Sequence, residues 1–128
     1  MSKVFGACAS RKSRLQEARW GAMHWLVDDA LIDGAELSVA RMTLKEDACS
    51  ESHGHPNCNE VVHLIQGTVE QSVGAERFVM QAGDTAFIPR GSLHRSRNVG
   101  RGEATMIVCY SAGSRIYEAA GESEHGER

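Results

Sequence analysis

Short apolar runs alternate with turn-forming residues along the middle of the chain. The runs are rich in Val, Ile, Leu and Thr and are separated by Gly, Asp and Asn. None of them keeps the apolar period of a surface helix, apart from a helical turn that could form near residues 12–19. The pattern therefore predicts an all-β domain.

Two of these runs are expected to pair early in the domain. Residues 20–27 (WGAMHWLV) lie ahead of residues 35–44 (AELSVARMTL), and the two segments could form neighbouring strands. In the second segment the apolar positions shift in parity between Val39 and Met42. Because side chains alternate between the two faces of a strand, the shift predicts that the apolar face changes partway along it.

The second half of the domain predicts further strands with short connections. Residues 60–91 favour three or four strands, joined by turns at Gly67, at residues 73–76 and at residues 82–84. Residues 103–111 (EATMIVCYS) are long enough for one buried strand. Strands at this spacing, with no helices between them, are typical of a sandwich or barrel of antiparallel sheets.

The length of the chain, 128 residues, is about that of one domain with one hydrophobic core. Residues 1–16 and residues 119–128 are polar, charged or small, and we expect both to be mobile tails. The predicted domain covers residues 17–118. We expect it to form a homodimer through the region of Trp20 and Trp25, since an open β-sandwich exposes strand edges.

Charge and cysteine content narrow the class of protein. The net charge is −3, from 14 basic and 17 acidic residues, and no run of either sign suits nucleic acid or a membrane surface. No stretch is long and apolar enough for a membrane span or a signal peptide, so we expect a cytoplasmic protein with a small-molecule or protein partner. The cysteines are scattered, which favours free thiols: Cys8, Cys49, Cys58 and Cys109.

Candidate metal ligands gather in the stretch SHGHPNCNE, residues 52–60. His53 and His55 are two residues apart and face the same side of an extended strand, where neutral imidazoles can approach one cation. Glu60 follows a turn and is expected to reach the same space from the next strand. If Glu60 faces inward, alternation places Val62 and Leu64 inward as well, and His63 on the opposite face.

A third histidine lies downstream in GDTAFIPRGSLHRSRN, residues 83–98. Pro89 and Gly91 predict a turn, and His94 opens the following strand. Ser96 and Asn98 are expected to share the face of His94.

These two stretches resemble the two sequence motifs of the cupins. The first motif is matched in His53, His55, Glu60 and Gly67, and the second in Gly83, Pro89, Gly91, His94 and Asn98. The one departure is Asp47, which stands where the first motif opens with glycine. Because Asp also tolerates turn conformations, we interpret this as a changed bend. The resemblance covers residues 37–110.

The resemblance implies the double-stranded β-helix, or jelly-roll, fold of the cupins. It also implies that one divalent cation is bound by His53, His55, Glu60 and His94, with a coordination position left for water or substrate. Three imidazoles and one carboxylate suit Fe, Mn, Ni, Co, Cu or Zn better than Ca or Mg. The sequence does not choose among these metals.

The resemblance leaves the reaction open, because cupins include enzymes of several classes and binding proteins. The inward residues are mostly aliphatic, so a metal would carry the chemistry. An apolar wall slightly favours dioxygenase chemistry, an oxidoreductase reaction. The alternatives are an oxygen-independent Lewis-acid isomerase, cyclase or lyase, and a binding or sensor module without turnover.

Several side chains are candidates for supporting roles. Glu60 or Tyr110 could carry a proton, and Arg90 could hold a substrate carboxylate or simply be a solvated loop residue. The apolar candidates for the cavity wall are Met42, Val62, Leu64, Met106 and Val108.

The remaining histidines and Cys58 have plainer interpretations. His24 suits packing or an interface, His63 faces outward, and His125 lies in the tail. Nothing close in sequence lowers the pKa of Cys58, which favours an inert thiol.

Overall fold

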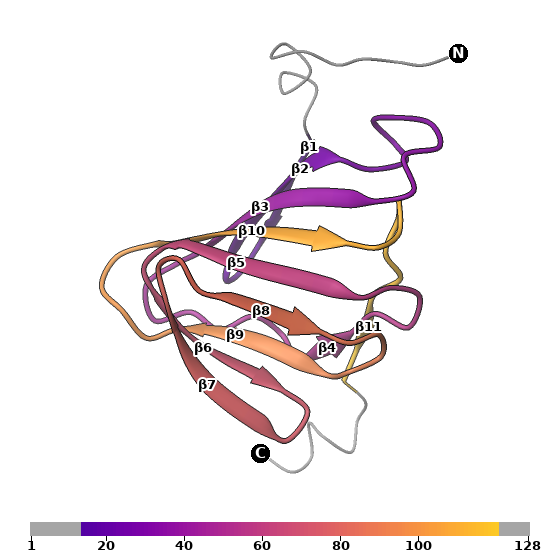
Figure 1. Cartoon of the computed structure of the whole chain (residues 1–128). Helices are drawn as coiled ribbons and strands as arrows, with labels where there is room; N and C mark the ends of the chain where they lie inside the picture. Colours follow the sequence, from indigo (N-terminus) through magenta and orange to yellow (C-terminus); the bar gives the residue numbers. More distant parts are fainter. Residues whose placement is uncertain (1–13, 121–128) are drawn as a thin grey trace.

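The computed structural model describes residues 14–120, and every element in that range is a strand (Figure 1). In the described residues no helix is long and apolar enough to cross a membrane. The strands, in chain order, are β1 (Arg14–Ala18), β2 (Gly21–Val27), β3 (Ser38–Leu44), β4 (His53–Gly54), β5 (Glu60–Gln66), β6 (Thr68–Val73), β7 (Glu76–Gln81), β8 (Thr85–Ile88), β9 (His94–Asn98), β10 (Ala104–Tyr110) and β11 (Glu118–Ala119).

The strands form two antiparallel sheets. The six-stranded sheet has the order β1-β2-β3-β10-β5-β8, and the five-stranded sheet has the order β11-β4-β9-β6-β7. Successive hairpins and crossovers between the sheets give the jelly-roll barrel expected from the sequence. The fold is a single all-β domain.

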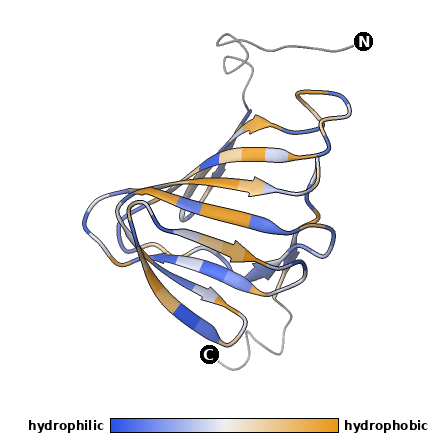
Figure 2. Ribbon diagram, in the orientation of Figure 1, coloured by the Kyte–Doolittle hydropathy of each residue, from blue (hydrophilic) through white to orange (hydrophobic). Residues whose placement is uncertain are grey.

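Alternation along the strands places the core between the two sheets. In β10 every second residue is buried, and in β5 the inward positions are Glu60, Val62 and Leu64. Figure 2 shows the hydrophobic colour concentrated along the central strands β5 and β10, whereas β9 is largely hydrophilic. The interior is therefore apolar on one sheet and polar on the part of the other that carries His94.

The strands predicted from the apolar runs are confirmed with small shifts. β2 pairs with β3, and residues 60–91 contain four strands, β5 to β8, with turns at the predicted positions. The predicted change of apolar face in the second segment is wrong. Residues 38, 40, 42 and 44 all face inward, and Leu37 precedes the strand and is exposed. Small residues at 38 and 40 concealed this regular alternation.

The first strand corrects two expectations at the amino-terminal end. Residues 14–18 form β1 and not a helical turn, and the ordered domain begins before residue 17. The segment pairs along its length with β2, in the register Arg14 opposite Trp25 and Ala18 opposite Gly21. Tertiary pairing overrides the weak helical preference of the sequence RLQEA. Residues 1–13 lie outside the described residues, as does Cys8.

The carboxyl-terminal end is also longer than expected. β11 pairs with β4, with Ala119 opposite His53, and the backbone N–H of Ala120 donates to the carbonyl of Ser52 at 2.9 Å. The predicted tail therefore begins too early, because residues 119 and 120 belong to the five-stranded sheet. Residues 121–128, with His125, lie outside the described residues.

The bend at Asp47 agrees with its interpretation from the sequence. Its φ is 65°, in the left-handed region that glycine adopts most readily. Asp47 thus takes the conformation of the motif's opening glycine, and the chain still turns toward β4.

Candidate metal centre

The four predicted ligands come from both sheets. His53 lies in β4 opposite His94, the first residue of β9, and His55 follows β4 directly. Glu60 begins β5, where it lies opposite Tyr110 and Ile88 of the six-stranded sheet. Closing the barrel brings these residues together, and all four ligand side chains are buried.

The side-chain atoms converge on one point. One ring nitrogen from each of His53, His55 and His94 lies within 4.8 Å of the others, which makes them a candidate metal-binding group. Oε1 of Glu60 lies 2.9 Å from Nε2 of His94 and 3.4 Å from Nε2 of His55. The structure therefore brings together the whole ligand set that the cupin resemblance implies.

Backbone carbonyls fix which nitrogen of each imidazole faces this point. Nδ1 of His53 donates to the carbonyl of Glu51 at 2.5 Å, Nδ1 of His55 to that of Ile116 at 2.9 Å, and Nδ1 of His94 to that of Ser92 at 3.0 Å. A carbonyl only accepts, so each Nδ1 carries the hydrogen and each Nε2 keeps a lone pair in the neutral ring. Such outer hydrogen bonds are typical of histidines that bind metals.

The inward atoms have the character of a cation site. Nε2 of His55, Nε2 of His94 and Oε1 of Glu60 are buried without a hydrogen-bond partner among the described residues. Three acceptors this close repel one another unless a proton or a metal ion lies among them. The donor set, with three imidazoles and a carboxylate, fits a divalent transition metal.

The pKa values of these groups reflect the same arrangement. Burial, with the charge of His94, lowers the pKa of His53 to about 3. Burial alone favours the neutral form of Glu60, but the close imidazoles of His55 and His94, which favour its ionised form, lower its pKa to about 2. Burial also disfavours charge on His94, yet the Glu60 carboxylate outweighs it and raises the pKa of His94. At neutral pH, Glu60 is ionised and His53 is neutral, as metal ligation requires.

A small cavity of about 30 Å³ adjoins the centre, large enough for about one water molecule. Of the predicted wall residues, Met42 and Val62 line it, and Tyr110 does too. Leu64 and Met106 are fully buried in the core and lie outside its lining, as does Val108. The aliphatic wall is therefore formed by fewer of the predicted residues. Leu64 and its cross-strand partner Met106 share the inward face but lie further along the strands from the end where Glu60 pairs with Tyr110.

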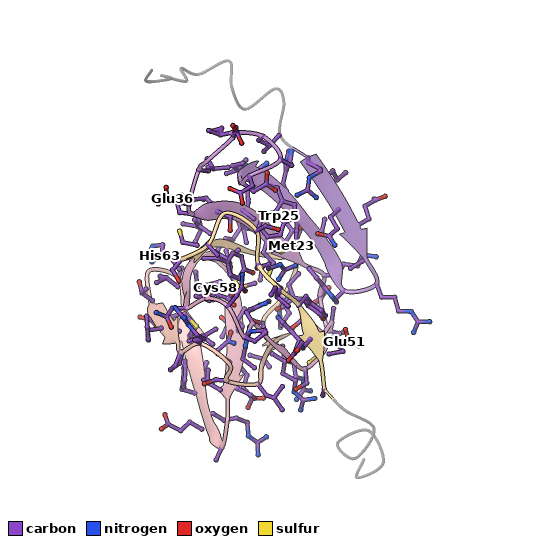
Figure 3. All side chains as sticks on the ribbon, turned by 90° about the vertical axis from the view of Figure 1, so that its right-hand side faces the viewer. Met23, Trp25, Glu36, Glu51, Cys58 and His63 are labelled. Carbon is purple, nitrogen blue, oxygen red and sulfur yellow. The ribbon has the colours of Figure 1, made fainter. Side chains whose placement is uncertain are left out.

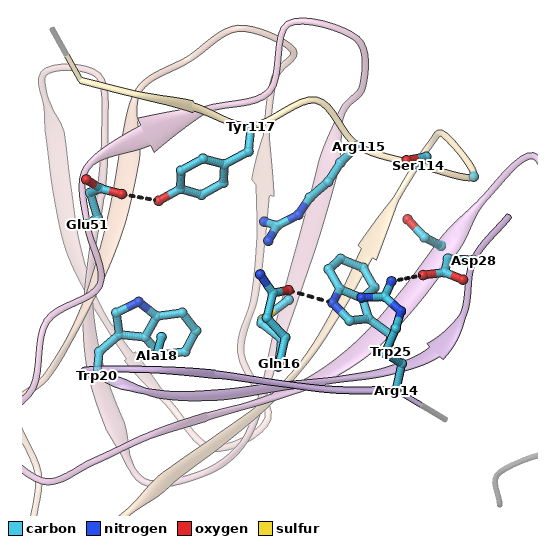
Figure 4. A pocket seen from close by; sticks show the side chains of 13 residues that line it. Arg14, Gln16, Ala18, Trp20, Trp25, Asp28, Glu51, Ser114, Arg115 and Tyr117 are labelled. Carbon is cyan, nitrogen blue, oxygen red and sulfur yellow. Dashed lines mark hydrogen bonds and ion pairs between the residues drawn. The ribbon is translucent and has the colours of Figure 1, made fainter. Parts of the chain in front are cut away.

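A second cavity, of about 480 Å³, opens beside the first between the β1–β2 hairpin and the segment 113–117 (Figure 4). Figure 3 labels three of its lining residues, Met23, Trp25 and Glu51. Four residues line both cavities, namely Trp20, Met23, Arg115 and Tyr117. Space for a small organic ligand therefore adjoins the candidate metal centre.

The structure places the remaining predicted site residues away from this space. Arg90 is exposed, and its backbone N–H donates to Oδ1 of Asn59 at 2.9 Å. It lines neither cavity, because the turn after β8 directs it to the surface. His63 faces outward as predicted, with Nδ1 2.7 Å from Oγ1 of Thr85. Cys58 is buried, and burial followed by the charge of Glu60 raises the pKa of its thiol, which leaves it unreactive.

Two further residues beside the centre, Arg115 and Tyr117, are not predicted by any pattern in the sequence. The Tyr117 ring stacks on His53, with centroids 4.5 Å apart and planes at 15°, and its hydroxyl donates to Oε1 of Glu51 at 2.6 Å. Nη1 of Arg115 donates to the hydroxyl of Tyr110 at 3.1 Å. Both lie after the last predicted strand, where no periodic pattern marks them, so only the fold could place them.

The two tryptophans of the predicted dimer region both line the larger cavity. Trp25 is only 4% exposed, and Trp20 is partly buried and packed against the core. The homodimer stays a prediction, supported by the edge strands β1, β7, β8 and β11. His24 lies on β2 with Nδ1 2.9 Å from Nη2 of Arg41, consistent with surface packing.

The fold and the site define a jelly-roll barrel with a three-histidine, one-glutamate candidate metal centre. A family model described as "Cupin domain" matches residues 40–110, which is more than half of the chain. The chain belongs to the cupin family.

Curated relatives include plant and bacterial proteins. A germin-like protein from Oryza sativa is 30% identical over 95 residues, and the match covers 70% of this chain and 42% of the length of that protein. A second, from Arabidopsis thaliana, is 32% identical over 88 residues, covering 65% of this chain and 42% of its own. A polyketide synthase protein, CurC, from Streptomyces cyaneus is 38% identical over 55 residues, covering 43% of this chain and 36% of its own. The matches span about two fifths of these relatives' lengths.

Solved structures of oxalate decarboxylases share the fold. The enzyme from Bacillus subtilis superimposes with a TM-score of 0.76 at 20% identity, covering 89% of this chain and 33% of that chain. The enzyme from Lactobacillus farciminis, as a formate complex, superimposes with a TM-score of 0.76 at 21% identity. The match covers 90% of this chain and 35% of that chain. At this identity the likeness shows the fold alone.

Proposed function

We propose that this cupin is a metal-dependent enzyme that acts on a small organic molecule beside the metal centre. The observation that carries the proposal is the convergence of three carbonyl-anchored imidazoles and the ionised Glu60 on one buried point. His53, His55, Glu60 and His94 would hold the ion. A divalent transition metal bound there supplies a Lewis acid or, with iron, a redox centre for reaction with oxygen.

Dioxygenase-type chemistry is the first candidate because of the wall around the centre. Met23, Met42 and Val62 form the apolar part of the wall of the small cavity. An apolar wall beside the centre limits the side reactions of reactive oxygen chemistry. Membership of the cupin family supports a metal-dependent function at this site in general terms.

An oxygen-independent Lewis-acid reaction is the second candidate, favoured by Tyr110. Burial and the charge of Glu60 raise the pKa of Tyr110 well above its usual value, although Arg115 opposes this shift. Tyr110 therefore stays protonated; the residue lines the small cavity, and its hydroxyl accepts a hydrogen bond from Arg115. A hydroxyl that keeps its proton can donate a hydrogen bond to a ligand and would stabilise the enolate of an isomerisation or β-elimination.

Anaerobic purification with metal analysis tests the centre itself. We expect about one transition-metal ion per chain in the native protein, and His94→Ala should reduce the metal content at least tenfold, since removing one of four ligands weakens binding strongly. His63→Ala, on the outer face, is the matched control and should keep the metal. Full metal content in His94→Ala would show that the site is wrongly assigned.

Reconstitution with single metals then separates the candidates. Iron-loaded protein is screened in an oxygen electrode against small organic acids, phenols and diketones, and zinc-, manganese- and nickel-loaded protein is screened without oxygen by mass spectrometry. Oxygen uptake that needs both iron and His94 supports the dioxygenase. Turnover without oxygen supports the Lewis-acid enzyme, and saturable binding with no product in either screen supports a binding module.

A further inference from the structure

The larger cavity contains a cationic side chain without a carboxylate partner. Arg115 lines both this cavity and the smaller one beside the candidate metal centre, and Figure 4 shows its side chain extending into the larger cavity. Arg14, which also lines the larger cavity, forms an ion pair with Asp28. Within residues 14–120, no ion pair involves Arg115. Its positive charge is therefore not neutralised by the protein's own carboxylates at contact distance.

Aromatic rings hold the Arg115 guanidinium in place. Its central carbon lies 5.0 Å from the ring centroid of Trp25 and 5.2 Å from those of Tyr110 and Tyr117. Cation–π contacts of this kind stabilise a guanidinium and leave its charge intact. Of its five N–H donors, one donates to the Tyr110 hydroxyl, so others are available for a ligand.

The walls of the cavity suit a flat ligand. In Figure 4 the rings of Trp20 and Tyr117 lie on opposite sides of the space, with Arg115 and Gln16 beside it. Oε1 of Gln16 accepts from Nε1 of Trp25 at 2.9 Å, which turns the amide nitrogen the other way as a second donor. Aromatic walls with a few fixed polar groups are typical of sites for planar organic ligands.

We propose that the larger cavity binds a small aromatic monocarboxylate, with the carboxylate on Arg115 and the ring between Trp20 and Tyr117. The planar guanidinium matches a carboxylate with two parallel hydrogen bonds. The other charged groups of the lining have partners of their own, Arg14 in its ion pair with Asp28 and Glu51 in its hydrogen bond from the Tyr117 hydroxyl. Because Arg115 also lines the small cavity, the bound carboxylate lies at the entrance to the metal centre. The inference rests on the proposed function, since it names the substrate class of the same site.

A fluorescence titration of the zinc-loaded protein tests this directly. The chain has two tryptophans, and both line the cavity, so intrinsic emission reports on its occupant. The probes are benzoate, its neutral analogue benzamide, and acetate, which lacks the ring. We expect benzoate to bind roughly 10- to 100-fold more tightly than benzamide, as a charge-assisted pair with Arg115 implies, and more tightly than acetate.

Substitutions assign the selectivity to Arg115. Arg115→Gln should weaken benzoate binding roughly 10- to 100-fold and leave benzamide binding unchanged. Arg95→Gln, at an exposed position on β9, is the matched control and should change neither. Arg115→Lys keeps the charge and should retain part of the preference for benzoate, which guards against a loss of folding in the glutamine variant.

Several outcomes overturn the inference. Equal affinity for benzoate and benzamide, unchanged benzoate binding in Arg115→Gln, or no saturable binding of benzoate at millimolar concentration would each do so. Repeating the titration on metal-free protein separates this inference from the proposed function. Arg115-dependent benzoate selectivity in a protein that binds no metal leaves the ligand class standing and removes the enzyme proposal.

Discussion

Asn98 belongs to the same sequence motif as His94, yet it serves the fold and not the metal. Its side-chain nitrogen lies 3.0 Å from the carbonyl of Leu44, 3.1 Å from that of Lys45 and 2.9 Å from that of Gly102, and its oxygen accepts from the N–H of Gly100 at 3.0 Å. Asn98 is almost fully buried. One amide thus fastens the ends of β3 and β9 to the loop before β10.

Replacing Asn98 by Ala should destabilise the domain without changing the metal centre. The variant leaves several buried backbone groups without partners, so we expect the free energy of unfolding to fall by about 2–4 kcal/mol. Urea denaturation measures this loss. Arg97→Ala, at the exposed neighbouring position, should change stability by less than about 0.5 kcal/mol. Loss of metal from the folded Asn98→Ala protein would contradict the division of roles within the motif.

At the scale of elements, the sequence predicts what repeats or what matches a motif. The alternation in residues 60–66 and 94–98 places Glu60 and His94 inward, and both expectations agree with the burial of β5 and β9. The ligand set follows from spacing, because two short gapped motifs specify both the strands and the turns between them.

The elements that the sequence could not predict are held by distant partners. β1 is a charged segment whose only ladder partner among the described strands is β2, and the segment 113–120 has no periodic pattern. The latter is fixed by contacts such as Nδ1 of His55 with the carbonyl of Ile116, across 61 positions of sequence. Arg115 and Tyr117 reach the cavity through these long-range bonds, which no local pattern encodes.

Gly21, at the start of β2, tests how closely the β1–β2 hairpin must approach β3. A Cβ at this position would lie 2.0 Å from the backbone oxygen of Thr43, and φ is +154°. Backbone cannot move aside cheaply, so Gly21→Ala should lower the free energy of unfolding by about 3 kcal/mol or more. Chemical denaturation followed by circular dichroism gives the value.

Gly74→Ala is the matched control for this hairpin. Gly74 also has a positive φ, +58°, but a Cβ added there would meet no described atom within 4 Å. The substitution should therefore show only the strain of the backbone conformation, about 1 kcal/mol. Equal losses in the two variants would mean that the hairpin is free to move away from β3.

The metal centre depends on the whole molecule, because its parts come from both sheets and from the carboxyl-terminal segment. His53 and His94 belong to the five-stranded sheet, Glu60 to the six-stranded sheet, and the carbonyl that orients His55 to Ile116. Separating the sheets removes the site. Any ion that binds only the folded chain must therefore stabilise the entire domain against unfolding.

The pH dependence of metal affinity follows from the proton that the metal-free centre holds. Burial opposes charge on His94, but the Glu60 carboxylate raises the pKa of His94 above its usual value, whereas the pKa of Glu60 falls to about 2 and that of His53 to about 3. Below the raised pKa, His94 carries a proton that a metal must displace, and above it the ring is neutral. Zinc affinity should therefore fall as pH decreases through the pKa of His94, by about tenfold per pH unit for each displaced proton.

Competition with a zinc-sensitive dye between pH 6 and pH 9 measures this change in affinity, and calorimetry in two buffers counts the protons released. His63→Ala should show the same profile, and an affinity that is constant over this range would contradict the His94–Glu60 pair as the source of the proton.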